Sequence, residues 1–374
     1  MKRLFLFMIG FCYRNIMKPI FFLQDPEKVH IRTTHVGERL GESAPVKKIF
    51  SLAFRHKYPA LSQSLFGIGF ETPVGLAAGF DYEAKLTQIL PSLGFGFGTV
   101  GTLTNFPYEG NPRPMLGRLP HSRSLMVNKG FKNLGVKNTL NNLRDKTFEY
   151  PVGVSIGKTN TAAHKTQEEA VHDIIAAFRI AEKSSVPFAY YELNISCPNL
   201  AGSIEFYAPH HLRNLLAAVE TLHVKKPLFI KMPISKTDAE ISEMLEVITS
   251  FSFVQAVILG NLQRDRHNPN LIPEEVARFT AGNFSGLPCQ SRSDELIRLV
   301  FRDFGKKIKI IGCGGIFSAK DAYRKMKLGA SLVELITGLV YEGPQLVAQI
   351  NSELPEFLAR DGLHSIREAV GLDA

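Results

Sequence analysis

The chain has 374 residues, of which 45% are hydrophobic and 21% charged, a composition typical of a globular protein with a sizeable core. Its four cysteines lie apart without any C-x-x-C pair, so the sequence indicates a reduced, intracellular protein with neither a disulfide framework nor a metal site. The formal net charge of +9 suits anionic ligands or anionic lipid, but the basic residues are dispersed, which argues against a nucleic-acid partner.

The N-terminal 24 residues differ in pattern from the rest of the chain. Two apolar runs, 4–12 and 16–23, are separated by a polar stretch containing Arg14. Each run is shorter than the ~18 residues that a membrane-crossing helix needs, and no small residues follow the first run as a cleaved signal peptide would require. The pattern favours a short element in the membrane interface, with apolar groups in lipid and basic groups toward phosphates. A hydrophobic arm packed on its own domain is the alternative.

Beyond residue 45, short apolar runs alternate with longer amphipathic stretches such as 166–183, 236–250 and 291–304. In those stretches apolar residues recur at spacings of three and four, which predicts helices. Eight runs are candidate strands: 74–78, 97–101, 152–156, 189–195, 228–232, 254–259, 307–312 and 331–335. Apolar strands that alternate with helices indicate a parallel sheet buried on both faces.

Eight such units predict an α/β fold of the (β/α)8 TIM barrel type, and a doubly wound open sheet is the alternative. We therefore expect two parts, an N-terminal helical arm over residues 1–44 and a barrel over residues 45–374. The gaps after the second and sixth strands are the longest, so we expect those two loops to build the substrate end.

Glycine and polar residues gather at the ends of the predicted strands, where a barrel of this kind carries its catalytic groups. The clearest examples are "AAGFD" at 77–81, "SIGKTN" at 155–160 and "NISCPN" at 194–199. The segment "IIGCGGI", 310–316, exposes backbone N–H groups ahead of a helix expected to start near Ser318 or Asp321, and this predicts a phosphate site. "LITG", after the eighth strand, completes that pocket.

Two reactive side chains stand at these strand ends. A lone cysteine is more often buried and inert than catalytic, but Cys197 lies just past a strand between Ser196 and Pro198, which favours a reactive role. Lys231 ends an apolar run, and an ammonium at a barrel mouth needs an anion or acceptor beside it. A lysine that reaches solvent from a strand end is the alternative for Lys231.

With these residues assembled, the chain resembles the dihydroorotate dehydrogenases, the flavin enzymes of pyrimidine synthesis, and it is most similar to their membrane-associated, quinone-using class. The resemblance runs from about residue 25 to 345 and is carried by motifs that are specific in number and order: "DPEKVH", "PVGLAAGFD", "GFGFGTVGTLT", "EGNPRPMLGRLP", "NKGFKNLG", "NISCPN", "NFSG", "IIGCGGI" and "GASLVELITG". It also implies that the N-terminal arm forms a tunnel for quinone.

The resemblance implies a reaction and its partners. Dihydroorotate is oxidised to orotate, FMN is the cofactor, and a membrane quinone accepts the electrons. Cys197 falls on the catalytic-base position and removes a proton from C5 while hydride leaves C6 for N5 of FMN. Lys231 stabilises the reduced flavin. Residues 1–24 contact the membrane peripherally, on its cytoplasmic or matrix side (the inner membrane in a bacterium).

The resemblance also implies two sets of binding residues. The cofactor set is Ala78, Gly79, Tyr82, Thr102, Ser155, Asn194, Lys231, Gly260, Gly286, Gly314, Gly315, Ile336 and Thr337. The substrate set is Asn128, Gly130, Phe131, Asn133, Asn194, Asn199, Asn261 and Leu262.

Five positions depart from the family pattern. The quinone class usually has serine where Cys197 stands, Tyr82 replaces a common lysine that helps hold flavin and substrate, and Ser155 replaces a usual asparagine. Gly260 and Leu262 replace usual threonines. Other functions therefore stay open. The chain could be an FMN barrel oxidoreductase that acts on another pyrimidine or uses a soluble acceptor, or a barrel lyase or isomerase without flavin. A membrane-bound barrel that has lost catalysis is a further alternative.

Overall fold

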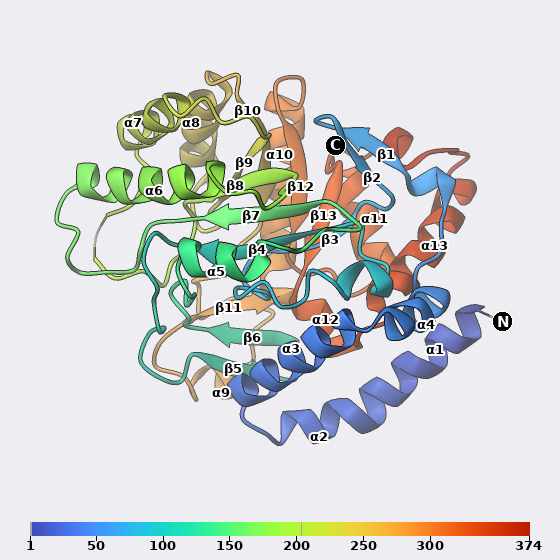
Figure 1. Cartoon of the computed structure of the whole chain (residues 1–374). Helices are drawn as coiled ribbons and strands as arrows, with labels where there is room; N and C mark the ends of the chain where they lie inside the picture. The colour runs from blue at the N-terminus through green and yellow to red at the C-terminus, as the bar shows by residue number, and fades with distance from the viewer. Residues whose placement is uncertain (1, 203) are drawn as a thin grey trace.

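The structure is a computed structural model that describes residues 2–202 and 204–374. Its centre is a closed barrel of eight parallel strands in the order β10-β12-β13-β3-β4-β7-β8-β9 (Figure 1). The barrel strands are β3 (Val74–Leu76), β4 (Phe97–Leu103), β7 (Val152–Ile156), β8 (Tyr190–Asn194), β9 (Leu228–Met232), β10 (Val254–Leu259), β12 (Lys309–Cys313) and β13 (Leu332–Leu335). Each matches one of the eight predicted runs. The (β/α)8 prediction is confirmed, and the open-sheet alternative is wrong.

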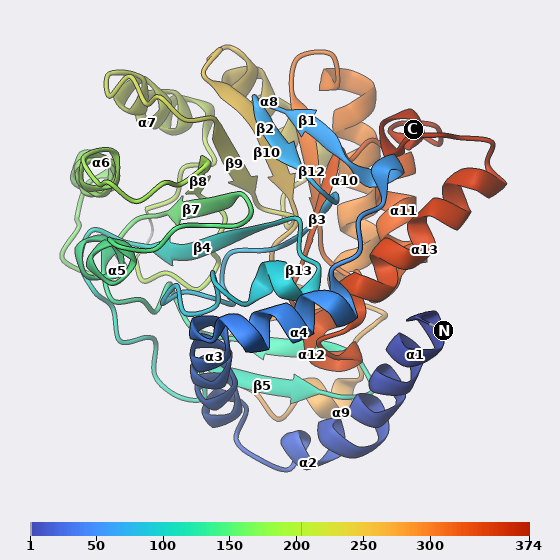
Figure 2. The same ribbon diagram turned by 45° about the vertical axis from the view of Figure 1, so that its right-hand side comes forward.

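Helices surround the barrel, as Figures 1 and 2 show from two directions. They are α5 (Val136–Leu143), α6 (Gln167–Glu182), α7 (Pro209–Glu220), α8 (Asp238–Thr249), α10 (Gln290–Phe304), α11 (Ala319–Lys327), α12 (Thr337–Glu342) and α13 (Leu346–Arg360). A short helix, α9 (Pro273–Val276), lies away from the barrel strands. Local sequence sets several of their starts. Thr166 with Glu169, and Thr237 with Glu240, form capping boxes that satisfy free N–H groups at the first turns of α6 and α8. Ser318 caps α11, as predicted.

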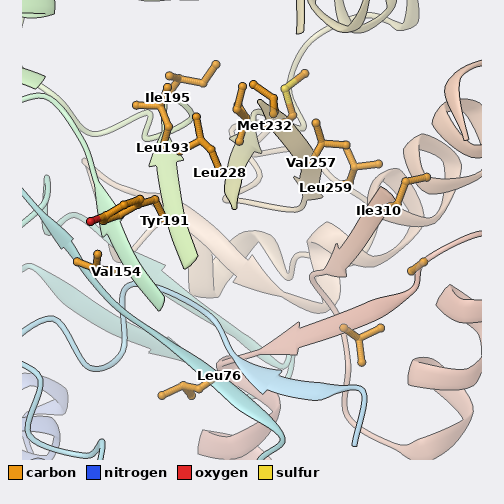
Figure 3. Close-up of a cluster of buried hydrophobic side chains, with 14 of the residues drawn as sticks. Leu76, Val154, Tyr191, Leu193, Ile195, Leu228, Met232, Val257, Leu259 and Ile310 are labelled. Atoms are coloured by element: carbon orange, nitrogen blue, oxygen red, sulfur yellow. The ribbon is translucent and has the colours of Figure 1, made fainter. Parts of the chain in front are cut away.

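Side chains on the barrel strands alternate between the barrel interior and the layer that faces the helices. On β8, Tyr191 and Leu193 belong to the large core between strands and helices, part of which Figure 3 shows. Their neighbours Tyr190, Glu192 and Asn194 make their contacts inside the barrel. One strand therefore supplies both the packing that holds the barrel and the polar groups at its centre.

The barrel interior changes from aromatic at one end to polar at the other. Tyr190 stacks on Phe229 with ring centroids 4.7 Å apart, and Phe66 packs on Phe229 at 4.8 Å. Phe66 belongs to a hairpin of β1 (Gln63–Leu65) and β2 (Ile68–Phe70) that closes this amino-terminal end. The polar groups are thereby left at the carboxyl-terminal end of the strands.

A small antiparallel sheet in the order β11-β6-β5 lies outside the barrel. It joins β5 (Leu116–Leu119) and β6 (Ser124–Val127), which follow barrel strand β4, to β11 (Asn283–Gly286), which follows β10. These segments come from the two long gaps noted in the sequence. The pairing of the two loops into one sheet was not predicted.

The N-terminal region is mostly helical. α1 (Lys2–Cys12), a π-helical turn η1 (Tyr13–Met17) and α2 (Lys18–Phe22) follow one another without a break, and α3 (Pro26–Glu42) and α4 (Ala44–Phe54) come next. The two apolar runs seen in the sequence therefore belong to one continuous helix. Arg3–Phe22 forms 20 helical residues, long and apolar enough by length and composition to cross a membrane. The polar residues between the runs are ordinary helix formers, so they interrupt the hydrophobicity but not the helix.

One side of this N-terminal helix packs on the barrel and another side is exposed. Leu6 is buried against Phe54 and Ala348, and the hydroxyl of Tyr13 donates to the carbonyl of Val340 at 2.8 Å. The exposed side carries large apolar side chains: Leu4, Phe5, Phe7, Met8, Phe11, Ile16, Met17, Ile20 and Leu23. Such a contiguous apolar face is unusual on a protein surface that meets only water.

Candidate functional site

A cavity of about 640 Å³ extends from the N-terminal helices to the carboxyl-terminal end of the barrel strands. Its arm side is mostly apolar and includes Val29, Val36 and Leu40 of α3, whereas its barrel side carries the polar strand ends. Five cations line it: Arg32, Arg118, Lys129, Lys132 and Lys231. Among the described residues no Asp or Glu does so, and the cavity therefore suits anionic ligands.

The structure brings most of the sequence-predicted site residues together around this cavity. Those that line it are Ala78, Gly79, Tyr82, Thr102, Gly130, Phe131, Asn194, Cys197, Asn199, Lys231, Gly260, Asn261, Leu262, Gly286, Gly314, Gly315, Ile336 and Thr337. They come from the ends of several different barrel strands, which is how barrel enzymes assemble active sites.

Three predicted residues lie outside the lining. Ser155 is fully buried beneath it and contacts Thr102. Asn128 Nδ2 donates to the carbonyl of Pro112 at 3.3 Å. Asn133 is buried, and its amide is occupied by the chain itself: Oδ1 accepts from the N–H of Gly135 at 2.7 Å, and Nδ2 donates to the carbonyl of Phe131 at 2.7 Å.

Cys197 follows β8 and is half-buried in the cavity wall. Burial raises the pKa of its thiol to about 12, although the backbone N–H of Asn199 and the charges of Lys231 and Lys158 oppose this shift. The group is therefore a thiol at neutral pH. A role as proton acceptor requires the small thiolate fraction, whose share grows tenfold with each pH unit below the pKa.

Lys231 lies near the carboxyl-terminal end of β9, opposite Asn194 in the pairing of β8 with β9. It is only 4% exposed and lines the cavity, yet it makes no hydrogen bond or ion pair with any residue that the structure describes. Burial alone would lower its pKa, but the carboxylates of Glu192 and Glu334 outweigh burial and hold the pKa above its ordinary value. The site thus keeps a permanent positive charge with room for an acceptor or anion.

Lys129 is a second cation of this kind, and it was missed in the sequence. It is 8% exposed, lines the cavity and has no hydrogen-bond or ion-pair partner in the described part of the chain. Its Nζ lies 4.1 Å from the centre of the Tyr82 ring, which stacks in turn on His30. Burial lowers the pKa of Lys129 to about 7, with Glu27 opposing. The motif "NKGFKNLG" contains this lysine, but nothing local shows that its side chain turns inward.

The glycines after β12 form a side of the cavity that suits an anion. Gly314 and Gly315 have φ values of +104° and +70°, which side-chain-bearing residues rarely adopt. Their backbone N–H groups have no hydrogen-bond acceptor among the residues described. Thr337, which begins α12, lines the same cavity, and its hydroxyl lies 2.8 Å from that of Ser285. Free backbone donors at adjoining loop ends fit a phosphate.

A network of amides holds the loops around the site, and sequence reasoning missed most of it. Asn283 Nδ2 donates to Asn199 Oδ1 at 2.6 Å, while Asn199 Nδ2 donates to the carbonyl of Val127 at 3.0 Å. Asn160 Nδ2 donates to the carbonyl of Gly130 at 3.0 Å. The partners come from loops far apart in sequence, so no local signal links them.

Comparison with known proteins identifies the family. The family model described as "Dihydroorotate dehydrogenase" matches residues 60–358, which is most of the chain. The chain belongs to the dihydroorotate dehydrogenase family. Enzymes of this family depend on a flavin, so the rivals without flavin are set aside.

Relatives of this chain match it over nearly its whole length. A protein of Nostoc punctiforme named dihydroorotate dehydrogenase (quinone) is 34% identical, over 96% of this chain and 98% of its own. One from Natronomonas pharaonis with the same name is also 34% identical, over 96% and 99%. The solved ferulenol complex of the Eimeria tenella enzyme is 26% identical and superposes with a TM-score of 0.81, covering 93% of this chain and 96% of that one.

Proposed function

We propose that this protein oxidises dihydroorotate to orotate in pyrimidine synthesis and passes the electrons through FMN to a membrane quinone. The observation that carries the proposal is a continuous cavity that joins an apolar arm side to polar, cationic strand ends. A polar pyrimidine and an apolar quinone can therefore reach one cofactor from different sides. Family membership and the names of the relatives support the same reaction.

The residues present fit FMN. The unpartnered Lys231 ammonium suits the polar edge of the flavin ring, and the free N–H groups of Gly314 and Gly315 suit its phosphate. FMN, when bound, accepts a hydride from dihydroorotate and supplies electrons to the quinone. Lys231 remains protonated across the physiological range and favours the negative charge that reduction brings to the ring.

Cys197 is the proposed proton acceptor. Oxidation of dihydroorotate breaks two C–H bonds, so the proton from C5 needs a base when hydride leaves C6. The Cys197 thiolate takes that proton and becomes a thiol, and Lys158 and Lys231 stabilise the thiolate beforehand. Lys158 is held close by its hydrogen bond to the carbonyl of Ala201 at 3.4 Å.

Lys129 is the proposed partner of the substrate carboxylate. Lys132 also lines the cavity, but its charge is already paired with Glu27 at 3.3 Å, whereas Lys129 is unpaired among the described residues. A buried ammonium without a partner gains most from an anionic ligand. The family pattern has a lysine at the position of Tyr82, and this sequence lacks it. With this assignment, Lys129 supplies a lysine beside Tyr82 instead.

The arm is the proposed route for quinone and the contact with the membrane. Residues 1–44 would form the arm and residues 45–374 the barrel domain, with the exposed apolar face of Arg3–Phe22 lying in the lipid interface. The packing of Leu6 and Tyr13 on the barrel favours a helix that lies on the membrane rather than across it. We place the protein on the cytoplasmic or matrix side.

The test is an anaerobic visible spectrum of the purified protein before and after dihydroorotate, followed by a quinone. We expect dihydroorotate to bleach the flavin band and quinone to restore it. A flavin that stays oxidised with dihydroorotate would contradict the substrate. Bleaching that quinone does not reverse would contradict the acceptor.

A further inference from the structure

A chain of hydrogen bonds runs from the cavity wall into the barrel interior and ends on a buried carboxylate. Asn194 Nδ2 donates to Thr102 Oγ1 at 2.8 Å, and Thr102 Oγ1 lies 2.8 Å from Ser155 Oγ. Ser155 Oγ donates to Glu192 Oε1 at 2.6 Å. Asn194 and Thr102 line the cavity, whereas Ser155 and Glu192 are completely buried below it on neighbouring strands.

The chemistry of the two ends fixes the direction of this chain. A carboxylate oxygen accepts hydrogen bonds, so Ser155 donates to Glu192, and Thr102 then donates to Ser155. At the other end the backbone N–H of Ser196 can only donate, and it lies 3.2 Å from Asn194 Oδ1. Both ends require the same amide orientation, with Oδ1 toward Ser196 and Nδ2 toward Thr102.

The series of hydrogen bonds continues in the same direction to a second amide of the cavity. Ser196 Oγ donates to Asn194 Oδ1 at 3.0 Å and accepts from Asn261 Nδ2. Asn261 also lines the cavity. The amides of Asn194 and Asn261 thus belong to one series of donors, and within the described residues Glu192 is the charged acceptor at its end.

We propose that Glu192 is a positioning residue of the active site: through Ser155 and Thr102 it turns the Asn194 amide so that an N–H group faces a carbonyl oxygen of the bound ring. The amide nitrogen of Asn194 has two N–H groups, and Thr102 uses one of them. The second is left for a ligand. A reversed amide would place its oxygen against that carbonyl, and two acceptors repel. The inference rests on the proposed function, because dihydroorotate and flavin supply the carbonyl.

A second buried carboxylate provides a matched control. Glu334 Oε1 accepts from Thr99 Oγ1 at 3.2 Å, and Thr99 Oγ1 lies 2.8 Å from the hydroxyl of Tyr190. Glu334, like Glu192, is completely buried and contributes to the charge around Lys231. Thr99 and Tyr190 do not line the cavity, so Glu334 shares the burial of Glu192 but not its connection to the ligand.

The experiment measures two quantities in the purified, flavin-loaded protein: the dissociation constant of orotate, from the change in flavin absorption, and the midpoint potential of the flavin. The variants are Ser155→Ala, Glu192→Leu, their double variant, Glu192→Gln and the control Glu334→Leu. We expect Ser155→Ala and Glu192→Leu each to weaken orotate binding about three- to tenfold, as the loss of one oriented hydrogen bond does.

The double variant should bind orotate no more weakly than the weaker single variant, because both changes cut the same chain. Glu192→Gln keeps an oxygen that can accept the hydrogen bond of Ser155. Its affinity for orotate should therefore fall less than the affinity of Glu192→Leu does. Both Glu192 variants should raise the midpoint potential, since each removes a negative charge from below the cavity floor. Ser155→Ala should shift the potential without changing any charge.

Additive losses in the double variant, or an equal loss of orotate binding in Glu334→Leu, would overturn the inference. If Glu192→Leu does not fold, Ser155→Ala and Glu192→Gln decide the matter alone. If the parent protein fails to bind orotate, the proposed function fails instead. In that case the midpoint potential of the flavin still tests the inference. An unchanged potential in Ser155→Ala would overturn the role of the hydrogen-bond series, and a shifted potential would support it.

Discussion

Replacement of Lys129 by methionine should weaken orotate binding and remove a specific pH dependence. Lys129 lines the cavity, is 8% exposed and has no ion-pair partner in the part of the chain that the structure describes. Methionine preserves most of the volume and the contact with Tyr82 but removes the charge. The perturbation therefore isolates the ammonium group.

The size of the effect follows from the burial of the charge. A hydrogen bond to a charged group contributes about 1.5–3 kcal/mol, and each 1.4 kcal/mol is a factor of ten in affinity. At pH 6, below the pKa of about 7 that burial gives Lys129, the ammonium is present and the full effect applies. We expect Lys129→Met to raise the orotate dissociation constant about 10- to 150-fold at that pH.

The pH dependence has a definite sign. Orotate binds the protonated amine, so binding raises a pKa that burial had lowered to about 7. Affinity of the parent protein should be level below pH 7 and should fall, by up to about tenfold per pH unit, above it. Glu27 opposes the shift and Lys132 and Glu83 act on the same group, and all three remain in the variant. The fall should vanish in Lys129→Met.

The assay is titration of the flavin absorption band with orotate between pH 6 and 9. Lys129→Arg keeps a charge that does not titrate in this range, and it should bind orotate without the fall above pH 7. Lys137→Met, an exposed lysine on α5, is the matched control. An orotate affinity that is the same in Lys129→Met, Lys137→Met and the parent would refute the reasoning.

Three further predictions concern other parts of the molecule. Cys197→Ala should slow reduction of the flavin by dihydroorotate at least about 100-fold. In the parent protein that rate should rise steadily to the highest pH tested, because burial raises the pKa of the Cys197 thiol to about 12. Stopped-flow absorbance measures both rates. Deletion of residues 1–24 should lower quinone turnover and recovery with lipid vesicles while leaving flavin reduction unchanged, because the exposed apolar face lies in that segment; unchanged quinone kinetics would argue against the tunnel. Phe229→Ala should lower the free energy of unfolding by about 3–5 kcal/mol in a denaturant titration, since its ring fills the aromatic end of the barrel.

The barrel could be predicted because each of its strands has a recognisable local sequence pattern. A run such as 228–232 is apolar, short and bounded by polar residues, and β9 occupies those positions. The hairpin of β1 and β2 was missed because each strand has only three residues and no strong alternation. The sheet of β5, β6 and β11 was missed because its pairing joins segments more than 150 residues apart. Pairing between distant segments leaves no local pattern.

The N-terminal helix shows why hydrophobicity alone does not mark where a helix ends. Polar residues near Arg14 look like an end when hydrophobicity alone is followed, but the backbone continues through them. Arg14 lies 3.5 Å from Glu342 of the barrel, so its charge has a partner on the docked side of the helix. A partner supplied by tertiary structure makes a charged residue acceptable inside an otherwise apolar helix.

The same limit explains why the residues of the site were found more readily than their charges and orientations. Asn194 and Lys231 could be placed at strand ends from the sequence, but the direction of the Asn194 amide depends on Glu192, two residues earlier on the same strand and reached only through Ser155 and Thr102. Strand alternation puts Glu192 and Asn194 on the same side, yet the link between them crosses to two other strands and returns. A polar residue inside a barrel strand, two positions before a binding residue, therefore indicates support for that binding residue. In this protein the signal lies on β8, where Glu192 precedes Asn194.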